Sequence, residues 1–205
     1  MNNIRMLSII FLGLSLPPIA VPQEKKIELS KDPLTAEQVQ IYRVILEHYT
    51  QNSDASLNIA VKTQAFDLTD SFVGLKAGEG CLKEIELANL KQTATTVHKL
   101  DARVLVGKRM VLVDPEEQSA LVRKNDPSNT IQGGKKVDEA VEQAFKSGLF
   151  SLSEIAFDKQ HEWAVLSYSF YCGGLCGHGA TVVLKKDKDT QEWKMTTRRC
   201  SDWIS

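Results

Sequence analysis

Apolar positions recur at helical spacing in the first two thirds of the chain and alternate with polar positions in the last third. Near the start, Thr35 is followed three residues later by Gln38, which is the signature of a capping box at the beginning of a helix. Tyr42 and Tyr49 then share one helical face. The pattern predicts a helix that begins after Thr35, ends near Gln51 and packs one face on a core.

Several short elements are predicted between this helix and the alternating region. Asp114 and Pro115 are typical of the cap and the first residue of a helix, and we expect this helix to stop before Asn125. Residues 125–136 are predicted to form a loop. The remaining elements expected here are strands over residues 57–61 and 110–113 and helices over residues 81–95 and 137–146.

The alternating region predicts strands joined by short turns, over residues 152–157, 162–171, 178–186 and 193–199. In the second strand one face carries Ala164, Leu166, Tyr168 and Phe170, and the other carries Trp163, Val165, Ser167, Ser169 and Tyr171. Helices first and strands last indicate an α+β fold. We expect N-terminal helices packed on a C-terminal antiparallel sheet of about four strands.

The first twenty residues have the organisation of a signal peptide. One basic residue, Arg5, precedes an apolar run over residues 6–16, and Ala20 offers a small residue for cleavage. The run is shorter than the roughly 20 apolar residues of a membrane span, although an uncleaved short tether is the alternative. We expect a secreted or periplasmic protein without a membrane span in the mature chain. Its predicted parts are a signal peptide (1–20), a flexible lead-in (21–33) and a single α+β domain (34–205).

Composition and charge are those of a globular chain. Of the 205 residues, 42% are hydrophobic and 25% are charged, and the formal net charge is −1. The absence of a basic surplus argues against nucleic acid as a partner. The expected partner is therefore an unknown protein or a small ligand, and no cofactor or metal is predicted.

The cysteines fit an oxidising compartment. The chain has four, Cys81, Cys172, Cys176 and Cys200, and an even number in an exported protein favours two disulfides. Four cysteines allow three pairings. The pairing of Cys172 with Cys176 and of Cys81 with Cys200 is attractive because the first two share one tight loop.

This loop between the second and third predicted strands is the most distinctive stretch of the sequence. Four glycines lie within residues 171–179, and glycine lets the backbone adopt positive φ and approach other groups closely. We favour a disulfide-braced hairpin over zinc binding by Cys172, Cys176 and His178, and over a cysteine nucleophile with a histidine base. The candidate binding residues on the loop are Tyr171, Gly173, Gly174, Leu175, Gly177 and His178.

Two functions from different classes remain. The first is an exported, non-catalytic binding or structural protein with a braced, glycine-rich loop. The alternative is an exported hydrolase that uses His178 with Glu154 or a cysteine. Glu154 lies in an otherwise apolar strand, where its carboxylate could be catalytic, point to solvent or pair with Arg198 or Arg199.

The last sixty residues carry a family resemblance. The segments concerned are residues 152–157 (LSEIAF), the strand ending at Tyr171, the Cys-Gly-Gly-Leu-Cys-Gly loop, residues 183–186 (VLKK), Trp193-Lys194 and the terminal Trp203-Ile204-Ser205. Together they resemble a family of uncharacterised exported bacterial proteins. The resemblance implies export and an antiparallel C-terminal sheet, and it implies no activity.

Overall fold

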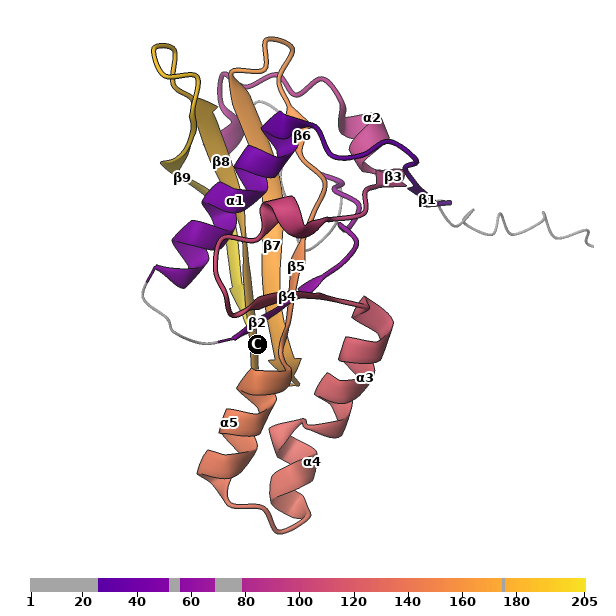
Figure 1. Cartoon of the computed structure of the whole chain (residues 1–205). Helices are drawn as coiled ribbons and strands as arrows, with labels where there is room; N and C mark the ends of the chain where they lie inside the picture. Colours follow the sequence, from indigo (N-terminus) through magenta and orange to yellow (C-terminus); the bar gives the residue numbers. More distant parts are fainter. Residues whose placement is uncertain (1–25, 52–55, 69–78, 175) are drawn as a thin grey trace, which may run out of the picture.

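The computed structural model describes residues 26–51, 56–68, 79–174 and 176–205, and only the backbone of Arg199 (Figure 1). The predicted signal peptide, residues 21–25 of the predicted lead-in and Leu175 lie outside this part. The elements are β1 (Glu28–Leu29), α1 (Ala36–Thr50), β2 (Leu57–Ala60), η1 (Gly80–Leu82), α2 (Leu90–Thr93), β3 (Thr96–Val97), η2 (Ala102–Val104), β4 (Met110–Val113), α3 (Pro115–Lys124), α4 (Pro127–Gln132), α5 (Val137–Ser147), β5 (Leu149–Leu152), β6 (Ala156–Phe157), β7 (Trp163–Gly173), β8 (Cys176–Lys186) and β9 (Trp193–Ile204).

The described residues form one large sheet, and it corrects our prediction of about four antiparallel strands. The sheet has seven strands in the order β4-β2-β5-β7-β8-β9, with β6 also paired to β7. Strands β5, β7, β8 and β9 pair antiparallel, as the alternation predicts. Strand β2, however, pairs parallel with both β4 and β5. The fold class is mixed α and β, but the sheet is larger and partly parallel.

Helix α1 covers one face of the sheet, which we call the α1 face (Figure 1). Its capping box is present, because Thr35 Oγ1 accepts from the Gln38 amide and the Gln38 side chain accepts from the Thr35 amide. Tyr42 and Leu46 are fully buried in one cluster with Phe150 and Leu166 of the strands. The helix predicted from spacing is therefore confirmed, and burial of its apolar stripe fixes it on the sheet.

The opposite face is covered at its two ends. At one end, the connection between β2 and α2 places Phe66, Leu82 and Ile85 against Val165 and Val183. At the other end, α3 packs Val122 against Ala60 and Leu149, and α3, α4 and α5 extend beyond the sheet (Figure 1). We call this face the open face, because polar side chains line it between these two covers.

Three local predictions are wrong. The helix expected over residues 81–95 is reduced to η1 and α2, because Glu84 between them has a positive φ of 70°. The loop expected over residues 125–136 contains α4, which Asp126 caps through a bond from the Ser128 amide. The strand expected over residues 152–157 is split into β5 and β6, because Glu154 turns inward toward another part of the chain.

The predicted lead-in over residues 21–33 includes a paired strand. Glu28 and Leu29 form β1, which pairs parallel with β3. The longest helix of residues 26–51, 56–68, 79–174 and 176–205 is α1, with 15 residues, and none of their helices reaches across a bilayer.

Candidate functional site

Both disulfides join the cysteines that the sequence analysis paired. Cys172 and Cys176 close the turn between β7 and β8, and Cys81 is bonded to Cys200, tying η1 to β9. The Cα atoms are 5.1 Å apart in each pair, a common separation for disulfides. Because all four cysteines of the chain are oxidised, none supplies a thiolate for zinc or for nucleophilic attack.

The braced turn is anchored to the start of α4. The Gly174 amide donates a hydrogen bond of 2.7 Å to Oδ2 of Asp126, the cap of that helix. This hydrogen bond is the main reason why the pKa of Asp126 lies below its ordinary value. Gly173 has φ of 139°, and a Cβ at that position would lie 3.0 Å from Pro127. Gly173 and Gly174 therefore allow the turn to approach the start of α4 closely.

His178 lies on the α1 face. It pairs with Phe170 across the hairpin, and its ring stacks on Tyr49 with centroids 5.6 Å apart and an interplanar angle of 16°. Partial burial lowers the pKa of His178. Tyr171 pairs with Gly177 at the next position, so Tyr171 belongs to the open face. Among the predicted binding residues, Tyr171 and His178 therefore lie on opposite faces of the sheet.

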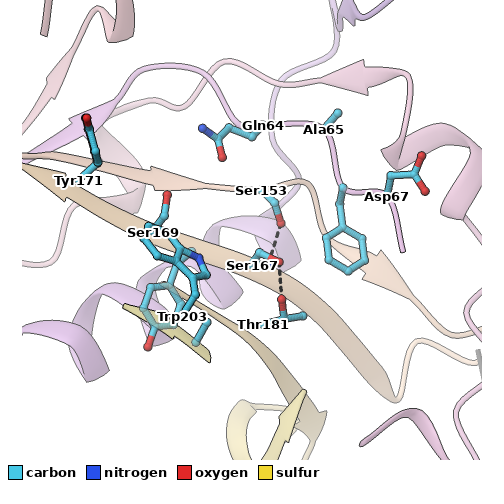
Figure 2. Close-up of a pocket in the computed structure, with 12 residues that line it drawn as sticks. Gln64, Ala65, Asp67, Ser153, Ser167, Ser169, Tyr171, Thr181 and Trp203 are labelled. Carbon is cyan, nitrogen blue, oxygen red and sulfur yellow. Dashed lines mark hydrogen bonds between the residues drawn. The ribbon is translucent and has the colours of Figure 1, made fainter. Parts of the chain in front are cut away.

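The open face holds a pocket of about 340 Å³ beside the braced hairpin (Figure 2). This volume lies at the lower end of the range of small-molecule sites. The residues that line it are Gln64, Ala65, Phe66, Asp67, Ser153, Ser167, Tyr168, Ser169, Tyr171, Ala180, Thr181 and Trp203.

Hydroxyl groups in register across the sheet form one side of the pocket. Ser167 Oγ lies 2.7 Å from Thr181 Oγ1, and Ser201 Oγ donates to the same Thr181 oxygen at 3.1 Å. The Ser167 amide donates to Ser153 Oγ, and Figure 2 shows Ser153, Ser167 and Thr181 joined in a line. These hydroxyls satisfy one another, so this row is a fixed, polar part of the pocket.

The adjacent row places the aromatic ring of Trp203 beside the hydroxyl of Ser169. Ser169, Gly179 and Trp203 are neighbours across β7, β8 and β9. A Cβ on Gly179 would collide with the indole of Trp203, and a Cβ on Gly177 would lie 3.2 Å from its Cζ3. One face of the indole therefore rests on β8, and its other face is turned away from the sheet. Figure 2 shows Trp203 next to Ser169.

Four neutral polar groups of the pocket make no protein hydrogen bond within the described part of the chain. They are the Gln64 amide, the hydroxyls of Ser169 and Tyr171 and the Trp203 indole N–H. No fully buried side-chain nitrogen or oxygen of the described residues lacks a partner, so solvent reaches all four groups. Asp67 carries the one charge among the described residues of the lining, and Figure 2 shows its carboxylate directed away from the hydroxyl row. The pocket is suited to an uncharged ligand that forms hydrogen bonds.

The alternating pattern in the sequence predicts part of this pocket. It placed Ser167, Ser169 and Tyr171 on one face of a strand, and the structure confirms this arrangement. It missed Trp203, because the last strand was expected to end at residue 199 whereas β9 continues to Ile204. The available signal was the pair of glycines at 177 and 179, which clear a space on the same face of β8.

A second cavity, of about 450 Å³, contains a buried carboxylate and imidazole. Oε2 of Glu154 lies 2.9 Å from Nδ1 of His98, and Oε1 accepts hydrogen bonds from the His98 amide and from Thr63 Oγ1. Glu154 is 3% exposed and His98 8% exposed. Glu154 therefore pairs neither with Arg198, which contacts Trp163 and Cys81, nor with His178.

Comparison with known proteins gave no relative of this chain. No family model, no curated protein and no solved structure matches it.

Proposed function

We propose that this chain is an exported, disulfide-braced binding protein without catalytic activity, and that the pocket on the open face holds a small uncharged ligand. The observation that carries the proposal is the set of four neutral polar groups that line the pocket and have no partner among the residues that the structure describes. Binding sites combine apolar and aromatic walls with a few convergent polar groups, and Phe66, Tyr171 and Trp203 supply the aromatic part.

Export is a separate part of the proposal. It is supported by the two disulfides, which persist in oxidising compartments, and by the apolar run after Arg5. The resemblance of the last sixty residues to exported bacterial proteins agrees with it. Intact mass of the exported, denatured and alkylated protein tests this part. We expect residues 1–20 to be missing and no cysteine to be alkylated before reduction, whereas retained residues or free thiols contradict it.

Ligand binding can be measured through Trp203. The chain has three tryptophans, and Trp163 and Trp193 do not line the pocket, so their indole signals serve as internal references. We would titrate ¹⁵N-labelled protein with a library of uncharged, ring-containing fragments. We expect a subset to shift the indole signal of Trp203 and the amide signals of Ser169 and Thr181.

The matched variant is Ser169→Leu, which fills the pocket without removing a protein hydrogen bond. We expect it to keep the parent's folded spectrum and to lose the shifts caused by fragments. A library that leaves Trp203 unmoved, or that shifts it equally in Ser169→Leu, overturns the proposed function.

A second candidate function rests on the His98–Glu154 pair and replaces the predicted partnership of Glu154 with His178. When the Glu154 carboxylate accepts from Nδ1–H of His98, Nε2 presents a lone pair, as in a general base. Nε2 has no protein partner in the described part of the chain, and no orphaned polar atom is fully buried there. This nitrogen is therefore reachable from the second cavity.

Hydrolysis of p-nitrophenyl acetate tests this second function. A general base at His98 predicts an esterase rate above that of buffer, which His98→Gln removes and His178→Gln retains. The same rate in the parent and in His98→Gln overturns it. A rate lost in His178→Gln and kept in His98→Gln also overturns it, because the base would then be His178.

A further inference from the structure

We infer that the ligand of the open-face pocket is a neutral saccharide, an inference that rests on the proposed function and names the class of its ligand. The charges of the lining limit the class of ligand first. Anionic ligands are bound through Lys, Arg or helix N-termini, and no basic side chain lines the pocket among the described residues. Cationic ligands require a carboxylate aimed inward, whereas the Asp67 carboxylate points away (Figure 2).

The hydrogen-bonding groups narrow the class further. Ser169 and Tyr171 hydroxyls donate and accept, and the Gln64 side chain offers a carbonyl oxygen and an NH2 group. Such a site matches ligand groups that both donate and accept hydrogen bonds through one atom. The hydroxyl group of an alcohol has this property. Ketones, ethers and aromatic amines would leave part of these groups unsatisfied, and unsatisfied groups oppose binding.

The position of Trp203 adds a second requirement. Its indole lies flat on the backbone at Gly179, which turns the other ring face away from the sheet. The face of an aromatic ring is electronegative and attracts weakly electropositive C–H groups. A sugar ring carries C–H groups on its faces and hydroxyls around its rim. It can therefore pack on Trp203 while its rim reaches Ser169 and Gln64.

The site is built before any ligand arrives. The Ser167–Thr181–Ser201 row holds the strands' side chains in place, and the Cys81–Cys200 disulfide fixes β9 three residues before Trp203. A preformed site loses little conformational entropy on binding, which favours recognition of a flexible, strongly hydrated ligand.

The experiment is a titration of the full mature chain with glucose, galactose, N-acetylglucosamine, cellobiose and chitobiose, followed by the indole signal of Trp203. Glucosamine and glucuronic acid are the cationic and anionic counterparts. Tighter binding of the disaccharides than of the monosaccharides indicates a glycan chain as the source, and equal binding indicates a free sugar. We expect saturable binding of at least one neutral sugar and at least fivefold weaker binding of its charged counterpart. In Trp203→Leu, where the amide signals of Ser169 and Thr181 report on the pocket instead, we expect binding to be lost.

Gln64→Ala and Ser169→Ala should each weaken the affinity for that sugar about five- to tenfold, which corresponds to about 1–1.4 kcal/mol. The matched control is Gln132→Ala, since Gln132 is exposed on α4 and does not line the pocket. If uncharged fragments bind but none of the five sugars does, the ligand class is wrong and the proposed function stands. If neither binds, both are wrong. Equal affinity for charged and neutral sugars also overturns the inference.

Discussion

The amide N–H of Gly174 donates a hydrogen bond of 2.7 Å to the carboxylate of Asp126, which joins the turn between β7 and β8 to the start of α4. Asp126 serves two purposes at once, because its other oxygen accepts from the Ser128 amide and caps the helix. The glycine-rich turn that stood out in the sequence is thus a joint between the sheet and the helical end of the molecule.

Replacing Asp126 should loosen this joint. Asp126→Ala removes both hydrogen bonds, and we expect it to lower the free energy of unfolding by about 1–2 kcal/mol, the usual cost of losing a helix cap. Urea denaturation measures the change. Asp126→Asn is the matched control, since Asn caps helices as well as Asp does and loses only the bond from Gly174, which its NH2 group cannot accept. An equal loss in both variants contradicts the role given to the cap.

Gly179 should not tolerate a side chain. Gly179→Ala places a methyl group against the Trp203 indole and the Tyr168 carbonyl oxygen. We expect a loss of about 1–3 kcal/mol in stability and a displaced indole signal of Trp203. Gly107→Ala is the control, because its Cβ would meet nothing closer than Met110 at 3.8 Å. An unchanged indole signal in Gly179→Ala means that the ring does not rest on β8.

The two disulfides should differ in their contribution to stability. Cys81 and Cys200 are 119 residues apart, whereas Cys172 and Cys176 are four apart. The entropy of loop closure predicts a loss of about 5 kcal/mol for the double variant C81S/C200S and about 2 kcal/mol for C172S/C176S. Denaturation of both variants beside the parent gives the order. The reverse order shows that the short bridge does more than close its own turn.

The buried carboxylate of Glu154 should be costly to remove. Glu154→Ala leaves His98 and Thr63 without their shared acceptor, so we expect a loss of about 3 kcal/mol or more. Glu142→Ala breaks an exposed pair with Lys146 on α5 and should leave the unfolding midpoint where it is. Similar midpoints for the two variants contradict the importance of the buried cluster.

His178 gives stability a pH dependence of known sign. Burial lowers its pKa in the folded state below the ordinary value of 6.5, so the unfolded chain binds a proton more readily. His178 therefore favours folding fully above about pH 6.5 and loses this contribution as pH falls through the folded pKa. We expect His178→Gln to flatten the stability curve between pH 7 and 5. NMR titration of His178 should give a midpoint below the ordinary value of 6.5.

Local sequence signals predicted the elements that depend on local chemistry. The capping box at Thr35, the cap at Asp114 and the alternation in β7 each involve neighbours within a few residues. Helix α4 begins with the same Asp-Pro pair as α3, but it buries none of its residues, so no apolar periodicity marks it. Its existence depends on the cap and on its place between α3 and α5.

The features that the sequence analysis missed arise between distant segments. The parallel pairing of β2 with β5 joins Asn58 to Leu149, and nothing in either short strand encodes its partner. His98 and Glu154 are 56 residues apart and on different connections. The pocket likewise needs Trp203 from the end of the chain to lie over a glycine of β8. Such contacts between distant residues follow from the whole fold, and no periodicity in the sequence indicates them.

The contacts between distant segments also impose an order on how the protein folds. Synthesis delivers α1 and β2 first, yet Tyr42 of α1 donates its hydroxyl hydrogen bond to the Ser153 carbonyl, 111 residues later in the chain. The sheet that α1 covers consists mainly of strands from the last third, and those strands can pair locally among themselves as soon as they emerge. The hydrophobic core under α1 is therefore incomplete until the C-terminal strands have formed. A chain that ends before β5 therefore contains α1 but lacks the strands that carry Phe150 and Leu166, on which this helix packs.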